Sequence, residues 1–207
     1  MTKTKFSEEF EAMESYVEKA MSFEEYIGLL DSLLARNETT GTNQSEKMVG
    51  FGKLNRQRMK RLMNTYRVPV EVRETANSLS RPLIWLILTE GWCGDAAQNI
   101  PVIEKIAEAN DLIETRYLLR DENIELMDRN LTNGARSIPK LICLDGESLA
   151  ELGTWGPRPK PAMELFIALR EEGVEKDEIL ERVQRWYLND KERSATLELG
   201  ELLKRWS

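Results

Sequence analysis

The chain has 207 residues, of which 41% are hydrophobic and 31% are charged, and its formal net charge is −7. That length suits one domain, alone or with a modest extension, and the apolar fraction is ample for a packed core. The negative net charge argues against extensive binding to nucleic acid, because the phosphate backbone attracts basic surfaces. We therefore expect a soluble protein with no nucleic-acid partner.

The sequence contains no histidine and two cysteines, Cys93 and Cys143. The missing histidine excludes Ser-His-Asp and Cys-His catalysis within this chain, as well as zinc or haem held by histidine. Two cysteines are also too few to close a structural zinc site. We expect no metal and no cofactor, so any chemistry must use a thiol, a carboxylate, a lysine or backbone groups.

The start of the chain, MTKTKFSEEF, has no apolar run after its lysines, so it does not have the pattern of a secretory signal. The longest strongly apolar stretch, Leu83 to Leu88, is far shorter than the roughly 20 residues that a membrane-spanning helix needs. These features predict a cytoplasmic location and no membrane partner, and they leave the oligomeric state open.

The first eighty residues have the pattern of helices. Apolar residues recur at helical spacing over 7–20 and again from Ser22 onward, where Ser22 and Glu25 form a capping box. The polar, glycine-containing stretch 37–46 predicts a loop. A further helix is expected over 47–66, and Pro69 should stop it because proline cannot continue a helix.

The hydrophobic period changes after residue 80. The continuous apolar run 82–88 is typical of a strand that is covered on both faces. After it, helical and strand patterns alternate, and Asp145-Gly146 indicates a hairpin turn. The expected elements are a helix over 94–109, a strand over 113–119, a helix over 122–130, strands over 140–144 and 149–154, and a helical tail over 163–206 with a break at Gly173. This order predicts an α/β fold.

Cys93 lies directly after the first predicted strand and directly before a predicted helix. A thiol in that position is close to unpaired N–H groups and to the positive end of the helix dipole, which both favour the thiolate. Trp92 offers an aromatic flank to the sulfur, and Gly94 permits a sharp turn. The pattern therefore indicates a reactive cysteine. The alternative is a cysteine that only packs at the end of a strand.

The stretch 89–96, Thr-Glu-Gly-Trp-Cys-Gly-Asp-Ala, resembles the active-site loop of the thioredoxin family, Trp-Cys-Gly-x-Cys. Pro101, eight residues after the cysteine, matches the proline that kinks the family's first active-site helix. Ile138 and Pro139 resemble the second family signature, in which a cis-proline opens the strand that faces the thiol. Pro139 follows Cys93 by 46 positions, close to the family's spacing.

The resemblance covers residues 80–172 and implies a thioredoxin-like fold, with a central mixed β-sheet flanked by helices. We expect the helical residues 1–79 to pack on this core, because their apolar faces are too rich to stay exposed. Residues 173–207 would then form a helical extension at the other end of the chain.

Three positions depart from the family pattern. Ala96 stands where the family has its resolving cysteine, so no internal disulfide can close across the loop. Asp95 replaces the common proline and places a negative charge two residues from the sulfur, where it opposes the thiolate. Ile87 stands where thioredoxins carry a buried carboxylate that helps the resolving thiol lose its proton. Ordinary two-cysteine turnover is therefore not expected.

Cys143 is expected to be too far away to act as the resolving thiol. It lies four residues beyond Pro139 in a strand, about 13 Å along at roughly 3.3 Å per residue. A disulfide needs Cα atoms within about 7 Å of each other. We interpret Cys143 as a buried packing cysteine.

Two further segments allow more than one interpretation. The basic stretch 53–61 is either a patch for an acidic partner or nucleic acid, or the solvated face of an amphipathic helix, and we favour the solvated face. The segment 155–159, Trp-Gly-Pro-Arg-Pro, contains Arg158. It could shape a binding rim beside Cys93 or serve only as a structural corner.

The leading functional hypothesis is single-cysteine thiol–disulfide chemistry with protein or small-molecule thiols and disulfides. Cys93 would attack a disulfide to form a mixed disulfide, and an external thiol would release it. The alternative is a redox-inactive thioredoxin-fold module that binds a protein or peptide. In either case the residues expected to shape the site are Trp92, Gly94, Asp95, Ala96, Ile138 and Pro139.

Overall fold

The computed structural model describes residues 5–190 and 193–207. Residues 1–4 of the expected N-terminal extension and residues 191–192 of the C-terminal one lie outside the described residues. The elements in chain order are α1 (Lys5–Lys19), α2 (Phe23–Ala35), α3 (Glu46–Thr65), α4 (Val70–Asn77), β1 (Leu83–Thr89), α5 (Gly94–Ala107), β2 (Ile113–Leu119), η1 (Arg120–Glu122), α6 (Ile124–Arg129), β3 (Lys140–Asp145), β4 (Glu151–Trp155), α7 (Lys160–Glu171), α8 (Lys176–Asn189) and α9 (Ser194–Trp206).

The four strands form one mixed sheet in the order β2-β1-β3-β4. β1 runs parallel to β2 and antiparallel to β3, and β3 runs antiparallel to β4. Every residue of β1 is buried, as its continuous apolar run predicts. The parallel pair β1 and β2 is joined by α5, since a parallel connection needs a crossover. The expected thioredoxin-like α/β class, a mixed sheet flanked by helices, is confirmed.

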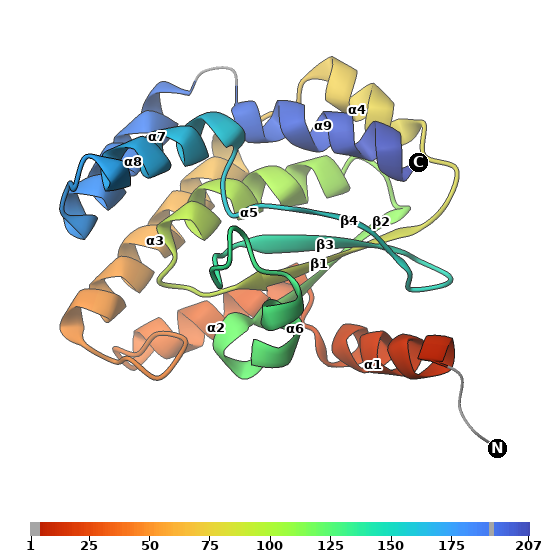
Figure 1. Ribbon diagram of the computed structural model, residues 1–207, viewed down its shortest axis with the longest axis horizontal. Coiled ribbons are helices and arrows are strands. Elements are labelled where there is room, and N and C mark those ends of the chain that lie inside the picture. The colour runs from red at the N-terminus through yellow and green to blue at the C-terminus, as the bar shows by residue number, and fades with distance from the viewer. Residues whose placement is uncertain (1–4, 191–192) are drawn as a thin grey trace.

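α5 is the central helix of the molecule. It contacts α3, α4, α8, α9 and β2, and it contains Pro101. The hydrophobic core around it includes Tyr26 and Met59 from helices that precede the sheet, and Leu199 and Leu203 from α9. Figure 1 shows α9 and α2 on opposite sides of the sheet; α9 contacts β4, and α2 contacts β2. The N-terminal helices therefore share one core with the sheet.

The start of α2 follows the local sequence signal. The Ser22 hydroxyl accepts a hydrogen bond from the Glu25 backbone N–H at 3.2 Å, and the Glu25 carboxylate accepts one from the Ser22 N–H at 2.7 Å. This reciprocal pair satisfies two N–H groups that a helix start leaves free. The predicted capping box is confirmed.

Two helix boundaries differ from the sequence prediction. Pro69 does not stop a helix, because α3 already ends at Thr65 and Pro69 directly precedes α4. Its fixed φ and missing N–H suit the start of a helix as well as a stop. In the tail, the predicted break at Gly173 is present, with φ of 72°. A second break follows Asn189 and separates α8 from α9.

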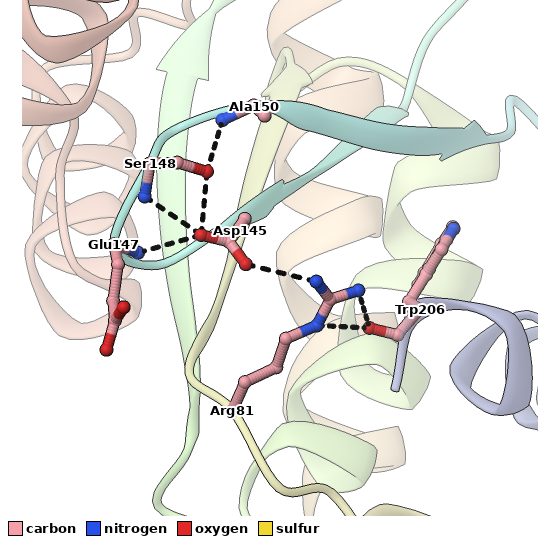
Figure 2. A network of polar contacts seen from close by, with 6 residues as sticks. All are labelled: Arg81, Asp145, Glu147, Ser148, Ala150 and Trp206. Carbon is pink, nitrogen blue, oxygen red and sulfur yellow. Dashed lines mark hydrogen bonds and ion pairs between the residues drawn. The ribbon is translucent and has the colours of Figure 1, made fainter.

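The last turn of α9 is tied to the β3–β4 turn by Arg81 (Figure 2). The Arg81 guanidinium donates to the Trp206 carbonyl oxygen at 2.8 and 3.1 Å and to the Asp145 carboxylate at 3.2 Å. The other Asp145 oxygen accepts the backbone N–H groups of Glu147 and Ser148. The turn therefore extends beyond the predicted Asp145-Gly146 pair, and Asp145 organises it.

α7 and α8 form a hairpin with a hydrophobic cluster of its own. Leu169, Ile179, Val183 and Tyr187 are buried against one another, apart from the main core. Figure 1 shows the two helices together as a layer at one end of the molecule, on the side where α5 begins. Across residues 5–190 and 193–207, no helix is both long and apolar enough to cross a membrane.

Candidate functional site

The sheet brings the two predicted motifs together at the sulfur of Cys93. Cys93 is the N-cap residue of α5, and its thiol donates a hydrogen bond to the Ile138 carbonyl oxygen at 3.2 Å. The Ile138–Pro139 peptide bond is cis, and it directly precedes β3, which pairs with β1. The predicted residues from 92 to 96 and from 138 to 139 therefore lie in two segments that meet at the thiol.

The thiol is buried and is held in its protonated form. Cys93 is 8% exposed, and this burial, followed by the charge of Asp95, raises its pKa to about 12. The backbone N–H groups of Asp95 and Ala96 and the charge of Arg158 lower the pKa, but they do not offset the burial. In this conformation burial therefore disfavours the thiolate more strongly than the helix N-terminus favours it.

Asp95 is held in a buried ion pair. Its carboxylate accepts hydrogen bonds from Arg158 at 2.5 and 3.2 Å, and the two side chains are 8% and 9% exposed. The Tyr187 hydroxyl donates to the other carboxylate oxygen at 3.0 Å. Burial still raises the pKa of Asp95. Asp95 therefore joins the active-site loop to Arg158 and to α8 as well as opposing the thiolate.

α8 covers the first turn of α5 through polar contacts. Gln98 donates to the Gln184 side chain at 3.0 Å, and Asn99 donates to the Tyr187 hydroxyl at 3.0 Å. A Cβ atom at Gly94 would lie 2.9 Å from the Gln184 amide nitrogen. The Gln184 side chain of α8 thus lies close against Gly94, whose φ is not positive.

The cis-proline side of the thiol is also covered by the chain itself. A Cβ atom at Gly156, which has φ of 110°, would lie 2.2 Å from the Pro139 carbonyl oxygen. The next residue, Pro157, offers its carbonyl oxygen to Asn99 at 3.2 Å. Backbone after β4 thus lies directly against Pro139, and the next residue, Arg158, pairs with Asp95 beside the thiol.

The loop before Cys93 is fixed from the N-terminal side of the molecule. The Gly91 N–H donates to the Thr40 hydroxyl at 2.9 Å, and Asn55 of α3 donates to the Gly91 carbonyl oxygen at 3.1 Å. The Arg120 guanidinium lies 5.0 Å from the ring of Trp92. Helices that precede the sheet therefore help to shape the site.

A buried carboxyl group lies three residues before Cys93, at Glu90. One Glu90 oxygen accepts the Asp121 N–H at 2.9 Å, and the other has no hydrogen-bond partner within the described part of the chain. Burial raises the pKa of Glu90. Ile87 is fully buried and apolar, as the departure from the family pattern implied. Sequence reasoning missed Glu90, although a charged residue at the end of a buried strand is a usable signal.

Cys143 is far from this arrangement in the sheet. It pairs with Trp85 at the opposite end of β1 from Thr89, it is fully buried, and both cysteines are free. Burial raises its pKa to about 12. The prediction of a packing cysteine is confirmed. Among the described residues, no group of three His, Cys, Asp or Glu side chains could hold a metal ion.

Several residues at the site were not found by sequence reasoning. Gln184 and Tyr187 lie 91 and 94 positions after Cys93, in α8, and Thr40 and Asn55 lie well before the loop. No local pattern marks them, because tertiary packing alone brings them to the loop. Of the two interpretations of Arg158, the structure supports a place at the rim of the thiol site.

The comparisons with known proteins agree with this geometry. A family described as thioredoxin matches residues 41–173, so the match includes α3 and α4. A protein of unknown function from Pseudomonas aeruginosa, solved by crystallography, is 16% identical and superimposes with a TM-score of 0.58, covering 93% of this chain and 96% of that one.

A crystallised HIV epitope scaffold is 15% identical, with a TM-score of 0.57, covering 92% of this chain and 96% of that chain. At these identities the likeness shows the fold alone. No curated protein matches the chain. Because the family match spans well over half of the sequence, the chain belongs to the thioredoxin family.

Proposed function

We propose that this thioredoxin-family chain is a binding protein in which Cys93 is a covered, protonated thiol rather than a turning-over nucleophile. The proposal depends on one observation: the thiol of Cys93, a residue that is 8% exposed, donates a hydrogen bond to the Ile138 carbonyl oxygen. A thiol that donates carries its proton. The function is then recognition of a partner, with the thioredoxin fold as scaffold.

The electrostatics support the same conclusion. A shift of the Cys93 pKa from 9.0 to about 12 lowers the thiolate fraction near neutral pH by roughly a thousandfold. A thiolate of higher pKa is also more nucleophilic, which offsets part of the loss in rate. The attack of Cys93 on a disulfide should therefore be roughly 30- to 60-fold slower than that of an ordinary thiol. α8 and Arg158 also contact Asp95 beside the thiol, and backbone lies against Pro139, so little of the sulfur is open to a disulfide.

The test is the reactivity of Cys93 in the native protein. In a Cys143→Ala variant, Cys93 is the only thiol, so its alkylation by iodoacetamide can be followed against pH. We expect an apparent pKa far above 8.5, and disulfide reduction no faster than for the matched Cys93→Ser variant. A Cys93 thiol that titrates near or below 8.5 and traps mixed disulfides would overturn the proposal.

The second candidate is single-cysteine thiol–disulfide exchange after the α7–α8 hairpin moves away. It is favoured by the separate hydrophobic cluster of the hairpin and by the two backbone N–H groups that stabilise a thiolate at Cys93. The thiolate would form a bond to one sulfur of a partner disulfide and release the other sulfur as a thiolate. An external thiol would then displace Cys93, since no second cysteine lies close by.

This candidate predicts that reactivity follows the contact between α8 and the loop. Tyr187→Phe removes the hydroxyl that bonds Asp95 and leaves the ring in its cluster. Mixed disulfides should then be detected by mass spectrometry with Tyr187→Phe and be absent from the matched Tyr187→Phe/Cys93→Ser variant. If Tyr187→Phe reacts no faster than the wild type, the hairpin does not gate the thiol.

A further inference from the structure

A cavity of about 270 Å³ lies where α3, α5 and α8 meet, behind the covered loop. Arg61 and Thr65 line it from α3, Gln98 from α5, and Tyr187 and Leu188 from α8, and Arg193 lies just before α9. None of the described residues that line it is acidic. The walls of this cavity are therefore polar and positively charged.

The two arginines of this cavity differ from Arg56 and Arg158 in having no acidic partner among the described residues. Arg56 is paired with Asp31, and Arg158 with Asp95. Within residues 5–190 and 193–207, neither Arg61 nor Arg193 forms an ion pair. Arg61 also faces another cation, because burial and then the charge of Arg61 lower the pKa of Arg58. On a chain with a net charge of −7, this is an unusual local excess of positive charge.

The positive lining continues beside the first cavity. A second cavity of about 480 Å³ is lined by residues near the end of α3 and by Arg67, Arg73 and Lys105. Glu108, the one acidic residue among the described residues that line it, is already paired with Lys105. Between the two cavities, the Arg193 guanidinium lies 5.6 Å from the ring of Tyr66. The aromatic ring holds Arg193 in place without neutralising it.

We propose that the cavity between α3, α5 and α8 binds a small ligand that carries an oxyanion, such as a phosphate or carboxylate group, with Arg61 and Arg193 as its charge partners. A small ligand is favoured over a nucleic acid because the cavity is bounded by three helices, and because the chain as a whole is acidic. The inference rests on the proposed binding function, for which it names the ligand class.

A ligand in this cavity would also favour the covered state of Cys93. It would contact α3 and α8 at the same time, and Tyr187, which lines the cavity, donates its hydroxyl hydrogen to Asp95 beside the thiol. A ligand that binds only when α8 is docked stabilises that state by mass action. At ten times its Kd it should slow the alkylation of Cys93 by up to about 11-fold.

The test is calorimetric titration with inorganic phosphate, pyrophosphate and citrate, at an ionic strength held constant with chloride. We expect binding at one site, weakened about tenfold or more by Arg61→Gln and by Arg193→Gln. Arg129→Gln, an exposed arginine of α6, is the matched control and should bind as the wild type does. No binding of any of the three probes would overturn the inference, as would equal weakening by the control.

A second pair of variants avoids any dependence on arginine packing. Leu188 is 65% exposed at the cavity wall and Leu197 is 49% exposed on α9, so both should tolerate aspartate. Leu188→Asp should abolish anion binding, and Leu197→Asp should not. If a single-stranded oligonucleotide binds and phosphate does not, a nucleic acid is the occupant and the small-ligand inference is wrong.

The same proteins separate this inference from the proposed function. If Cys93 is alkylated slowly with a high pKa and no anion binds, the anion-site inference is wrong and the proposed function stands. A fast, low-pKa Cys93 that traps disulfides would sink the proposed function, whether or not phosphate binds.

Discussion

α9 and the α7–α8 hairpin follow one another in the chain but are attached to the sheet in different ways. α9 places Leu199, Leu203 and Trp206 in the main core, and Arg81 binds the carbonyl of its last turn (Figure 2). The hairpin keeps a cluster of its own and meets the Cys93 loop and the first turn of α5 through polar contacts. Two segments with the same helical pattern therefore have different roles: α9 is part of the main core, and the α7–α8 hairpin covers the Cys93 loop.

The difference matters for the thiol. A helix that belongs to the main core cannot leave it without global unfolding, whereas a unit with its own cluster can separate at lower cost. The cover over Cys93 is thus the part of the C-terminal region that is able to move.

The largest expected effect concerns the two hydrophobic clusters. Leu203→Ala should lower the free energy of unfolding by about 2–5 kcal/mol, because Leu203 is fully buried in the main core. Leu169→Ala makes the same deletion in the hairpin cluster, and its cost is limited to the free energy with which the hairpin docks. Urea unfolding measures both. Equal losses would mean that the hairpin is an integral part of the core.

A pH dependence of the unfolding free energy, of similar size, is expected from Glu104 in the main core. Glu104 of α5 accepts a hydrogen bond from the Tyr117 hydroxyl of β2, and its burial raises its pKa from 4.5 to about 7. Because the folded state prefers the protonated acid, its stabilising contribution is complete below pH 4.5 and is lost as the pH rises through 7. The difference of 2.5 pKa units corresponds to roughly 3 kcal/mol.

Thermal unfolding between pH 5 and 8 tests this linkage. We expect the wild type to lose stability as the pH rises and Glu104→Gln, which cannot ionise, to lose much less. A wild type whose stability is flat over this range would contradict the raised pKa.

A comparable loss of stability, about 3–5 kcal/mol, together with a clear effect on reactivity, is expected from Asp95→Asn. The change leaves the buried Arg158 without its counterion and removes the charge that opposes the Cys93 thiolate. We expect alkylation of Cys93 in the Cys143→Ala background to be about three- to fourfold faster for each unit by which the pKa falls, since the tenfold gain in thiolate is partly offset by the lower basicity of the sulfur.

The matched control is Asp177→Asn, which removes an exposed α8 partner of Lys47. Because the Asp177 side chain is 72% exposed, its ion pair should hold α8 only weakly, and Cys93 should react as in the parent. If both variants accelerate alkylation equally, Asp95 is not the contact that holds the cover.

The smallest expected effect is that of Arg81→Gln at the end of α9. The side chain is partly exposed, so losing its hydrogen bonds to Trp206 and Asp145 should lower the free energy of unfolding by about 1 kcal/mol. Urea unfolding should show this loss with no change in Cys93 alkylation. Faster alkylation in Arg81→Gln would show that α9 and the hairpin move together.

Much of the core was predictable because its signals are local. The capping box at Ser22, the apolar run of β1 and the alternation up to β4 each depend on a few neighbouring residues. The resemblance of the Cys93 loop and of Ile138-Pro139 to the two thioredoxin signatures implied that they belong to one site, and the Cys93 thiol bonds to the carbonyl that precedes Pro139.

What could not be predicted depends on burial and distant contacts. The rise in the Cys93 pKa could not be predicted, because the helix N-terminus is visible in the sequence whereas the burial of the thiol is not. The break between α8 and α9 lacks a glycine or proline, so no punctuating residue marked it. Glu90 and Tyr187 likewise have roles that only the folded chain defines.

The ion pair between Asp95 and Arg158 also has an evolutionary consequence. Neither charge is tolerable alone in so buried a place, so substitutions at the two positions should be inherited together. Relatives with a proline or cysteine at the position of Asp95 should lack a cation at that of Arg158. The paired charges would then mark, from sequence alone, the branch of the family in which the thiol is covered.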